Sequence, residues 1–324
     1  LHRQPGEGYK VITLAGTTKA RVTTTGGDLF PAFFVYIFND ILKKKKKALR
    51  IIGKLFKILL ILIICISISY FVFSLIVRPS VNRDWNIDQK VMPEVTFNSD
   101  IVSIKNIRNI KYRSTTDYDV RYYDKTFDLN KLNSVWYMVE PFTGHGAGAA
   151  HTLLSFGFEN GDYVSISVEI RKEKGESFGA VKGILRQYEL MYVIADENDV
   201  IKLRSNFRKD EVFLYPVKTS RENMRKLFVS MLNRSNKLAK EPEFYNTLTS
   251  TCTTNIVSHI NEIVPGRIPL SFKVLMPAYS DELAYRLGLI DNTIPFEQLR
   301  NKYHINERAM KYADDPMFSK KIRE

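Results

Sequence analysis

The stretch HTLLSFGFENGDYVSISVEIR, residues 151–171, decides the fold of this chain. Two runs of alternating residues flank the four residues ENGD at 159–162. Asn-Gly between two such runs is a strong β-hairpin signal, because both residues tolerate the positive φ that a tight turn needs. The stretch therefore predicts a hairpin within an antiparallel sheet.

Outward from the hairpin, the pattern changes from strands to helices. Strands are expected at residues 95–97, 101–112, 135–139, 189–195, 199–204 and 212–217. Helices are expected at residues 220–239, 252–263, 279–288 and 295–302. The aperiodic segment 114–132 is expected to be a surface loop. Strands followed by helices predict an α+β fold.

An apolar run precedes this domain. Residues 58–77 carry no charge, and twenty helical residues rise about 30 Å, the thickness of a bilayer core. Five lysines at 43–47 lie just before it, and positive residues stay on the cytoplasmic side. The sequence predicts a single-pass inner-membrane protein with a cytoplasmic N-terminus and a periplasmic domain.

The charge pattern agrees with this topology. Residues 1–57 hold 12 Lys/Arg and 3 Asp/Glu, so they account for nine of the thirteen net positive charges. The excess belongs to the membrane-flanking segment, and no nucleic-acid partner is expected. The expected divisions are a basic segment that is partly disordered, a transmembrane helix, a linker, a periplasmic domain and a tail, at residues 1–54, 55–77, 78–92, 93–305 and 306–324.

Cys252 is the first candidate for chemistry. It follows several hydroxyl residues at the predicted start of a helix, where free N–H groups and a partial positive charge lower a thiol pKa. The other cysteine, Cys65, lies inside the apolar run, so no disulfide can form within the exported part. A free thiol outside the cytoplasm suggests a nucleophile.

A cysteine nucleophile needs a base and an orienting group. His151 begins the first hairpin strand, and the Asn-Gly turn places Glu169 opposite it to within one position. The alternatives are a polar residue at a strand start for His151 and a surface ion pair with Arg171 or Lys172 for Glu169. His259 is about 10 Å along the helix from Cys252, too far for direct proton transfer, so a solvated or capping role is expected for it.

Cofactor sites are not indicated. His145 and His151 have no neighbouring cysteine or carboxylate cluster that would complete a metal site, and no glycine-rich phosphate loop opens a helix. No cofactor and no metal are therefore expected.

Several segments of the exported part resemble the Lnb N-terminal periplasmic domain family. They are NIRNIKYRSTTDYDVRYYD (106–124), AHTLLSFGFENGDYVSISVEIRKEKGE (150–176), RQYELMYVIADENDVIKLR (186–204), VFLYPV (212–217), YNTLTSTCTTNI (245–256) and DELAYRLGLID (281–291). The resemblance implies that the chain comes from a Gram-negative bacterium. It also implies a permuted papain-like fold, in which a histidine on a strand precedes a cysteine on a helix.

The family's name comes from lipoprotein N-acyltransferases. The resemblance implies that Cys252 forms a thioester, that His151 activates the thiol and that Glu169 orients His151. It favours a thiol-dependent acyltransferase or hydrolase acting on phospholipid or lipoprotein at the membrane surface. A papain-like peptidase or amidase for cell-wall peptides, and a non-catalytic envelope module, remain alternatives. The oligomeric state is left open.

Overall fold

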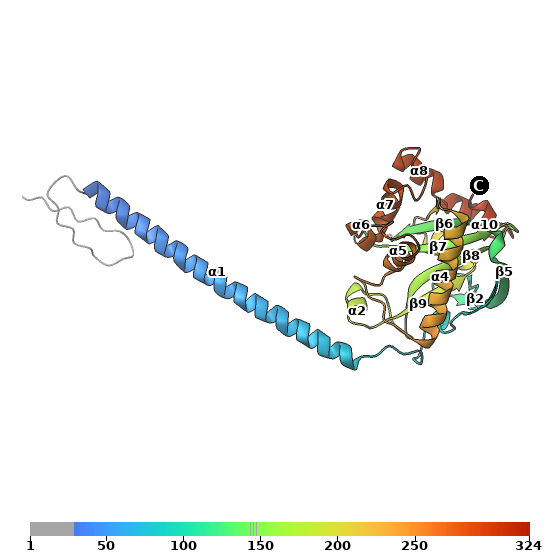
Figure 1. Ribbon diagram of the computed structural model, residues 1–324, viewed down its shortest axis with the longest axis horizontal. Helices are drawn as coiled ribbons and strands as arrows, with labels where there is room; N and C mark the ends of the chain where they lie inside the picture. Colours follow the sequence, from blue (N-terminus) through green and yellow to red (C-terminus); the bar gives the residue numbers. More distant parts are fainter. Residues whose placement is uncertain (1–28, 143, 145, 147) are drawn as a thin grey trace, which may run out of the picture. The chain divides into compact units, whose positions relative to one another are not determined.

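The structure, a computed structural model, describes residues 29–142, 144, 146 and 148–324 (Figure 1). His145, one of the two histidines weighed as metal ligands, lies outside the described residues. The chain divides into a helical unit that ends at Val77 and a compact unit from Arg78 to Glu324. This division falls where the sequence predicts the end of the transmembrane helix.

The helical unit contains α1 (Leu29–Ile76). Residues Tyr36–Ile76 are long and apolar enough to cross a membrane. The helix is longer than the predicted span at 55–77, because it continues through the lysine run at 43–47. Lysine is a good helix former, so the basic segment extends the helix instead of ending it.

The compact unit is a mixed α+β domain, as the order of elements predicts. Its strands are β1 (Glu94–Asn98), β2 (Ile101–Arg108), β3 (Lys111–Tyr112), β4 (Tyr118–Asp119), β5 (Tyr122–Asp128), β6 (Leu132–Pro141), β7 (Ala150–Phe158), β8 (Tyr163–Arg171), β9 (Glu189–Ala195) and β10 (Phe213–Pro216). Its α-helices are α2 (Ala180–Ile184), α3 (Glu197–Lys202), α4 (Arg221–Lys240), α5 (Cys252–Ile263), α6 (Phe272–Leu275), α7 (Ser280–Arg286), α8 (Phe296–Tyr303), α9 (Asn306–Lys311) and α10 (Phe318–Lys321). A π-helical turn, η3 (Leu203–Arg208), follows α3.

One large sheet organises the domain. Its strand order is β1-β2-β9-β8-β7-β6-β10, and β5 also pairs with β2. The neighbours are antiparallel except β2 and β9, which run parallel and meet at Arg108 and Ala195. The sheet is therefore mixed, but all its other strand pairs are antiparallel, as the hairpin predicts.

The hairpin at 151–171 is confirmed as β7 and β8. Leu153 pairs with Ser167, and Gly161 has a φ of 84° in the turn, a value that favours glycine. Continuing this register by two residues places His151 opposite Glu169. The sequence predicted this pairing to within one position, and the register places both side chains on the same face of the sheet.

Helices cover both faces of the sheet. On the first face, Leu154 and Phe156 of β7 pack with Phe228 of α4 and Ile256 of α5; we call it the α4–α5 face. Figure 1 shows α4 lying across the strands. The opposite face packs against apolar residues of α3, α9 and α10, and we call it the α3 face. Its core residues include Met138, Leu153, Met191, Val193, Val200, Ile201, Ala309, Phe318 and Ile322.

Two local predictions were wrong. Residues 199–204, predicted as a strand, belong to α3 and η3, because the Asp196 side chain caps the helix by accepting from the backbone N–H of Asn198. The segment 114–132, predicted as a loop, contains β5, which pairs with β2.

The predicted linker and tail are parts of the compact unit. In the linker 78–92, Trp85 is buried against the guanidinium of Arg171, with 4.2 Å between guanidinium carbon and ring centre. In the tail 306–324, Phe318 and Ile322 are fully buried on the α3 face. These apolar residues are too widely spaced to reveal their burial by periodicity.

Candidate functional site

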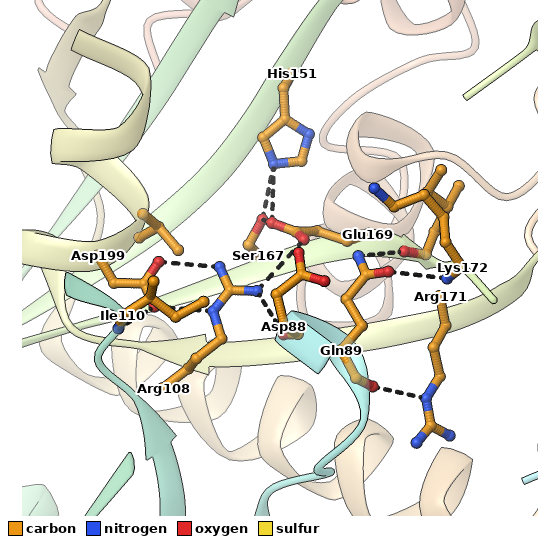
Figure 2. Close-up of polar contacts among 12 residues, drawn as sticks. Asp88, Gln89, Arg108, Ile110, His151, Ser167, Glu169, Arg171, Lys172 and Asp199 are labelled. Carbon is orange, nitrogen blue, oxygen red and sulfur yellow. Dashed lines mark hydrogen bonds and ion pairs between the residues drawn. The ribbon is translucent and has the colours of Figure 1, made fainter. Parts of the chain in front are cut away.

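His151 and Glu169 meet through a serine. His151 Nε2 lies 2.7 Å from Ser167 Oγ, and Ser167 Oγ donates a hydrogen bond of 2.8 Å to Glu169 Oε1 (Figure 2). The direct distance from His151 Nε2 to Glu169 Oε1 is 4.0 Å. Ser167 therefore lies between the two side chains that the sequence predicts to interact directly.

The hydrogen bonds define the tautomer of His151. The hydroxyl of Ser167 has one proton, and it goes to the carboxylate of Glu169. Ser167 Oγ must then accept from His151, so Nε2 carries the proton and Nδ1 is the unprotonated nitrogen. Burial, followed by the positive charge of Arg204, lowers the pKa of His151 to about 3, so the ring is neutral.

Glu169 is held ionised by two arginines. Arg204 donates to it at 3.1 Å, and a nitrogen of Arg108 lies 4.0 Å from it. Burial alone would raise the pKa of Glu169, but Arg108 and Arg204 lower it well below its ordinary value. Arg108 also binds Asp199 through two hydrogen bonds, of 2.9 and 3.1 Å (Figure 2).

A second carboxylate extends this cluster. Glu140 is fully buried beside His151 in the sheet register, 2.6 Å from Nε of Arg204. Burial raises its pKa to about 7 in spite of Arg204. Glu140, Arg204, Glu169, Arg108 and Asp199 alternate in charge along the α3 face, and we call them the charge ladder.

Cys252 opens α5, as the sequence predicts. Thr251 is the N-cap, and its hydroxyl accepts from the backbone N–H of Thr254, whose hydroxyl accepts in return from the N–H of Thr251. This capping box leaves the N–H groups of Cys252 and Thr253 without an intrahelical partner. The thiol is buried, with Thr253 Oγ1 at 3.8 Å from Sγ.

The sheet separates Cys252 from His151. Side chains alternate along a strand, so His151 shares the α3 face with Leu153. Its neighbour Thr152 points to the α4–α5 face and contacts Thr253, with 3.0 Å between the hydroxyl oxygens. Cys252 belongs to the core of that face. The structure therefore brings His151 and Glu169 together and does not bring either of them to the thiol.

An apolar cavity lies on the α4–α5 face, and its lining includes Thr253, the residue after Cys252, but not Cys252 itself. Thr253 of α5 and Tyr137 of β6 line it, and almost all its other lining residues are aliphatic. Its volume is about 60 Å³, below the usual range of small-molecule sites, so the cavity would have to widen to admit an acyl chain. Tyr137 donates a 2.7 Å hydrogen bond to Ser280, so its hydroxyl is satisfied at the cavity wall.

His259 has a different role from the solvated or capping one that the sequence suggested. It is buried between α4 and β9, where its Nε2 lies 2.8 Å from the Tyr192 hydroxyl and its Nδ1 lies 2.8 Å from Ser230 Oγ. Burial lowers its pKa to about 4. These contacts join α5 to α4 and to the sheet.

Sequence reasoning missed Ser167 as the intermediary and Tyr137 as the residue beside the cavity. Ser167 could have been found, because it alternates with Glu169 on one strand. Tyr137 carried no signal, since its position near Cys252 depends on helix packing. In the described part of the chain, no group of three or more His, Cys, Asp or Glu side chains could hold a metal ion.

Comparison with known proteins agrees with the resemblance noted from the sequence. Residues 118–278 match the family described as the Lnb N-terminal periplasmic domain. The matched region contains β5 to β10, the hairpin, Cys252 and His151. No curated protein and no solved structure matches the chain.

Proposed function

Residues 118–278 make this chain a member of the Lnb N-terminal periplasmic domain family, and on this premise we propose that it is a membrane-anchored thiol-dependent acyltransferase or hydrolase for phospholipid or lipoprotein. The proposal places the domain on the periplasmic side of the inner membrane, with the N-terminus of α1 in the cytoplasm. The observation that carries it is the apolar cavity lined by Thr253, in the first turn of the helix that Cys252 opens.

The cavity favours an acyl chain over a peptide. Its lining offers aliphatic surface from α5, α7 and the sheet, and few polar groups that would pair with peptide N–H and C=O groups. An acyl chain in the cavity would leave its carbonyl near the first turn of α5. There the free N–H groups of Cys252 and Thr253 would stabilise a developing oxyanion.

The reaction would proceed through a thioester. Attack of Cys252 Sγ on the carbonyl carbon of an ester breaks the C–O bond, and the alcohol leaves with the proton lost by the thiol. An amine or water then breaks the C–S bond, and its proton returns to Sγ. For His151 and Glu169 we propose a positioning role, because their place on the α3 face keeps them from the thiol.

A second candidate function has its own support. The sheet between Cys252 and His151 fits a non-catalytic module that binds an acyl chain in the same cavity. Such a module would hold lipid without forming a thioester.

The test uses the full chain in proteoliposomes whose phospholipids carry labelled acyl chains. Cys65→Ser in α1 removes the other thiol, so that an acyl adduct in the intact mass must lie on Cys252. We expect acyl release and an adduct that Cys252→Ala abolishes. Release that persists in Cys252→Ala contradicts the thiol mechanism, and lipid binding without release favours the second candidate. Cleavage of cell-wall peptides instead would identify a peptidase.

A cavity-filling variant tests the acyl chain itself. Ala284 of α7 lines the cavity, so Ala284→Phe should block long chains and leave a short-chain ester as a substrate. Ala309→Phe overpacks the α3 face, away from the cavity, and is the matched control. Equal loss for long and short chains in Ala284→Phe would contradict this assignment.

A further inference from the structure

Four large apolar side chains are exposed together around α2. Val181 is 68% exposed and Leu185 follows it one helical turn later, so both lie on one face of this short helix. Phe178 precedes the helix, and Leu248, 57% exposed, belongs to a turn beside it. We call these four residues the α2 surface.

The α2 surface is held as one unit. Thr247 Oγ1 donates a 2.7 Å hydrogen bond to the carbonyl of Ala180, which fixes the Leu248 turn against α2. On the inner side of α2, Gly183 lies so close to Thr247 and Tyr245 that a side chain there would collide with them. The face of α2 that carries Gly183 therefore packs against the domain, and Val181 and Leu185 face the solvent.

The segment that follows α1 contacts Glu173, before α2 in the sequence, and Glu189, after it. The N–H of Ser80 donates to Glu189 at 3.1 Å, and Arg83 pairs with Glu189 and with Glu173, each at 2.9 Å. Four residues of chain connect Ile76, the last residue of α1, to Ser80, and when fully extended they span at most about 14 Å. The chain length thus limits how far Ser80, and with it its partner Glu189, can lie from the last residue of α1.

The charge of the α2 surface suits phospholipid. Residues 178–188 contain Lys182 and Arg186 and no acidic residue. Nearby acidic groups are engaged, because Glu173 pairs with Arg83 and Glu176 accepts from Gln187. Apolar side chains flanked by basic ones are typical of segments that lie in the interface of an anionic membrane.

We propose that the α2 surface is a second membrane contact, which inserts Phe178, Val181, Leu185 and Leu248 among the lipids of the bilayer that α1 spans. The turn that carries Leu248 leads directly to the N-cap of α5, since Asn246 and Ser250 pair across it. The contact would therefore bring the first turn of α5 to the lipid surface. The proposal concerns lipid contact and does not depend on thiol chemistry.

The test measures the depth of single fluorescent labels. The full chain with Cys65→Ser and Cys252→Ala receives one new thiol, by Val181→Cys or Leu248→Cys, labelled with an environment-sensitive dye. Met310→Cys is the matched control, because Met310 is equally exposed, on α9 of the same domain. The proteins are reconstituted into vesicles of phosphatidylcholine with phosphatidylglycerol, with spin-labelled lipid or aqueous iodide as quencher.

We expect spin-labelled lipid to quench the labels at 181 and 248 several-fold more than the label at 310. Adding Leu185→Asp should lower the lipid quenching at 248, and so should replacing phosphatidylglycerol by phosphatidylcholine. Iodide quenching at 181 equal to that at 310 overturns the proposal. Protection at 181 from both quenchers also overturns it, because a protein partner or a second copy then covers the surface. Since the labelled protein lacks Cys252, neither result bears on the thioester.

Discussion

Thr152 and His151 are neighbours in β7, but they belong to different chemical environments. Thr152 contacts Thr253 beside the thiol, whereas His151 joins Ser167 and the charge ladder. A shift of one residue in strand register would exchange the two faces. The register of β7 therefore decides whether the imidazole of His151 or the hydroxyl of Thr152 lies next to α5.

A substitution at His151 distinguishes the two roles open to this residue. Removing a general base from an active site costs about 10²- to 10⁴-fold in rate. A positioning residue on the α3 face should cost less than about tenfold in kcat/KM for acyl release, together with a lower Tm. We expect His151→Gln to show this smaller loss, measured on the full chain in proteoliposomes.

Ser167→Ala is the matched control for that experiment. It removes the link between His151 and Glu169 without touching either ring nitrogen or thiol. A positioning role predicts similar effects of His151→Gln and Ser167→Ala on rate and Tm. A loss above about 10²-fold in His151→Gln alone, with an unchanged Tm, would show direct catalysis.

Buried histidines make the stability depend on pH. Above the ordinary histidine pKa of about 6.5, His259 is neutral in both the folded and unfolded states and contributes no pH dependence. Between pH 6.5 and its folded pKa of about 4, only the unfolded state binds the proton. The free energy of unfolding then falls by about 1.4 kcal/mol for each pH unit lost per such histidine.

His259→Gln isolates this contribution, because Glu140, with its pKa raised to about 7, acts in the opposite direction and affects both proteins equally. We expect the wild type to lose stability relative to His259→Gln as the pH falls from 6.5 to 4. Urea unfolding followed by the fluorescence of Trp85 and Trp136, both in the compact unit, measures the difference. A difference that does not change with pH would show that His259 is protonated when folded.

At the scale of the element, α5 was predictable to the residue. Its first residue, Cys252, follows a hydroxyl N-cap, and Pro265 and Gly266 come just after its end. By contrast, α3 was predicted as a strand. Asp199 in this helix is buried because Arg108, far away in sequence, binds it. Local patterns could not reveal that long-range pair, so apolar Val200 and Ile201 resembled a strand.

Arg323, two residues after the end of α10, adds a charged contact to the apolar packing of Phe318 and Ile322. Arg323 donates to Glu197 at 2.8 Å and lies over the ring of Tyr163, with 3.8 Å between guanidinium carbon and ring centre. Glu197 is fully buried, so Arg323→Ala would leave an unpaired carboxylate inside the domain. We expect a loss of about 3–5 kcal/mol in the free energy of unfolding.

Lys320→Ala is the control for that substitution, because Lys320 is an exposed cationic residue of α10, three residues before Arg323. Its effect should stay within about 0.5 kcal/mol in urea unfolding. Equal effects of Arg323→Ala and Lys320→Ala would mean that the C-terminal helix does not hold the sheet.

At the scale of the whole molecule, orientation in the membrane is the main prediction. The lysines at 43–47 should keep the start of α1 in the cytoplasm. Alkaline phosphatase fused after Glu324 should therefore be active, since it folds only outside the cytoplasm. The same reporter fused after Arg50 should be inactive. Activity of the Arg50 fusion alone would reverse the topology.

The sequence predicted this division between anchor and domain, but not the limits of the domain. The boundary at 77 follows from the end of an apolar run, which is a local property. The packing of Trp85 and of Phe318 depends on partners more than eighty residues away, in β8 and α3. Segments with one or two anchoring residues look like linkers until the sheet that receives them is known.

The charge ladder and the separate buried pair of Arg323 with Glu197 have a practical consequence for the choice of an expressed fragment. The family match covers 118–278, yet Arg108 precedes it and Arg323 follows it. A fragment limited to the matched residues would bury Asp199 and Glu197 without their arginines. Expression boundaries should therefore be drawn at Arg78 and Glu324, because a shorter recombinant fragment would lack the counter-ions that its own interior requires.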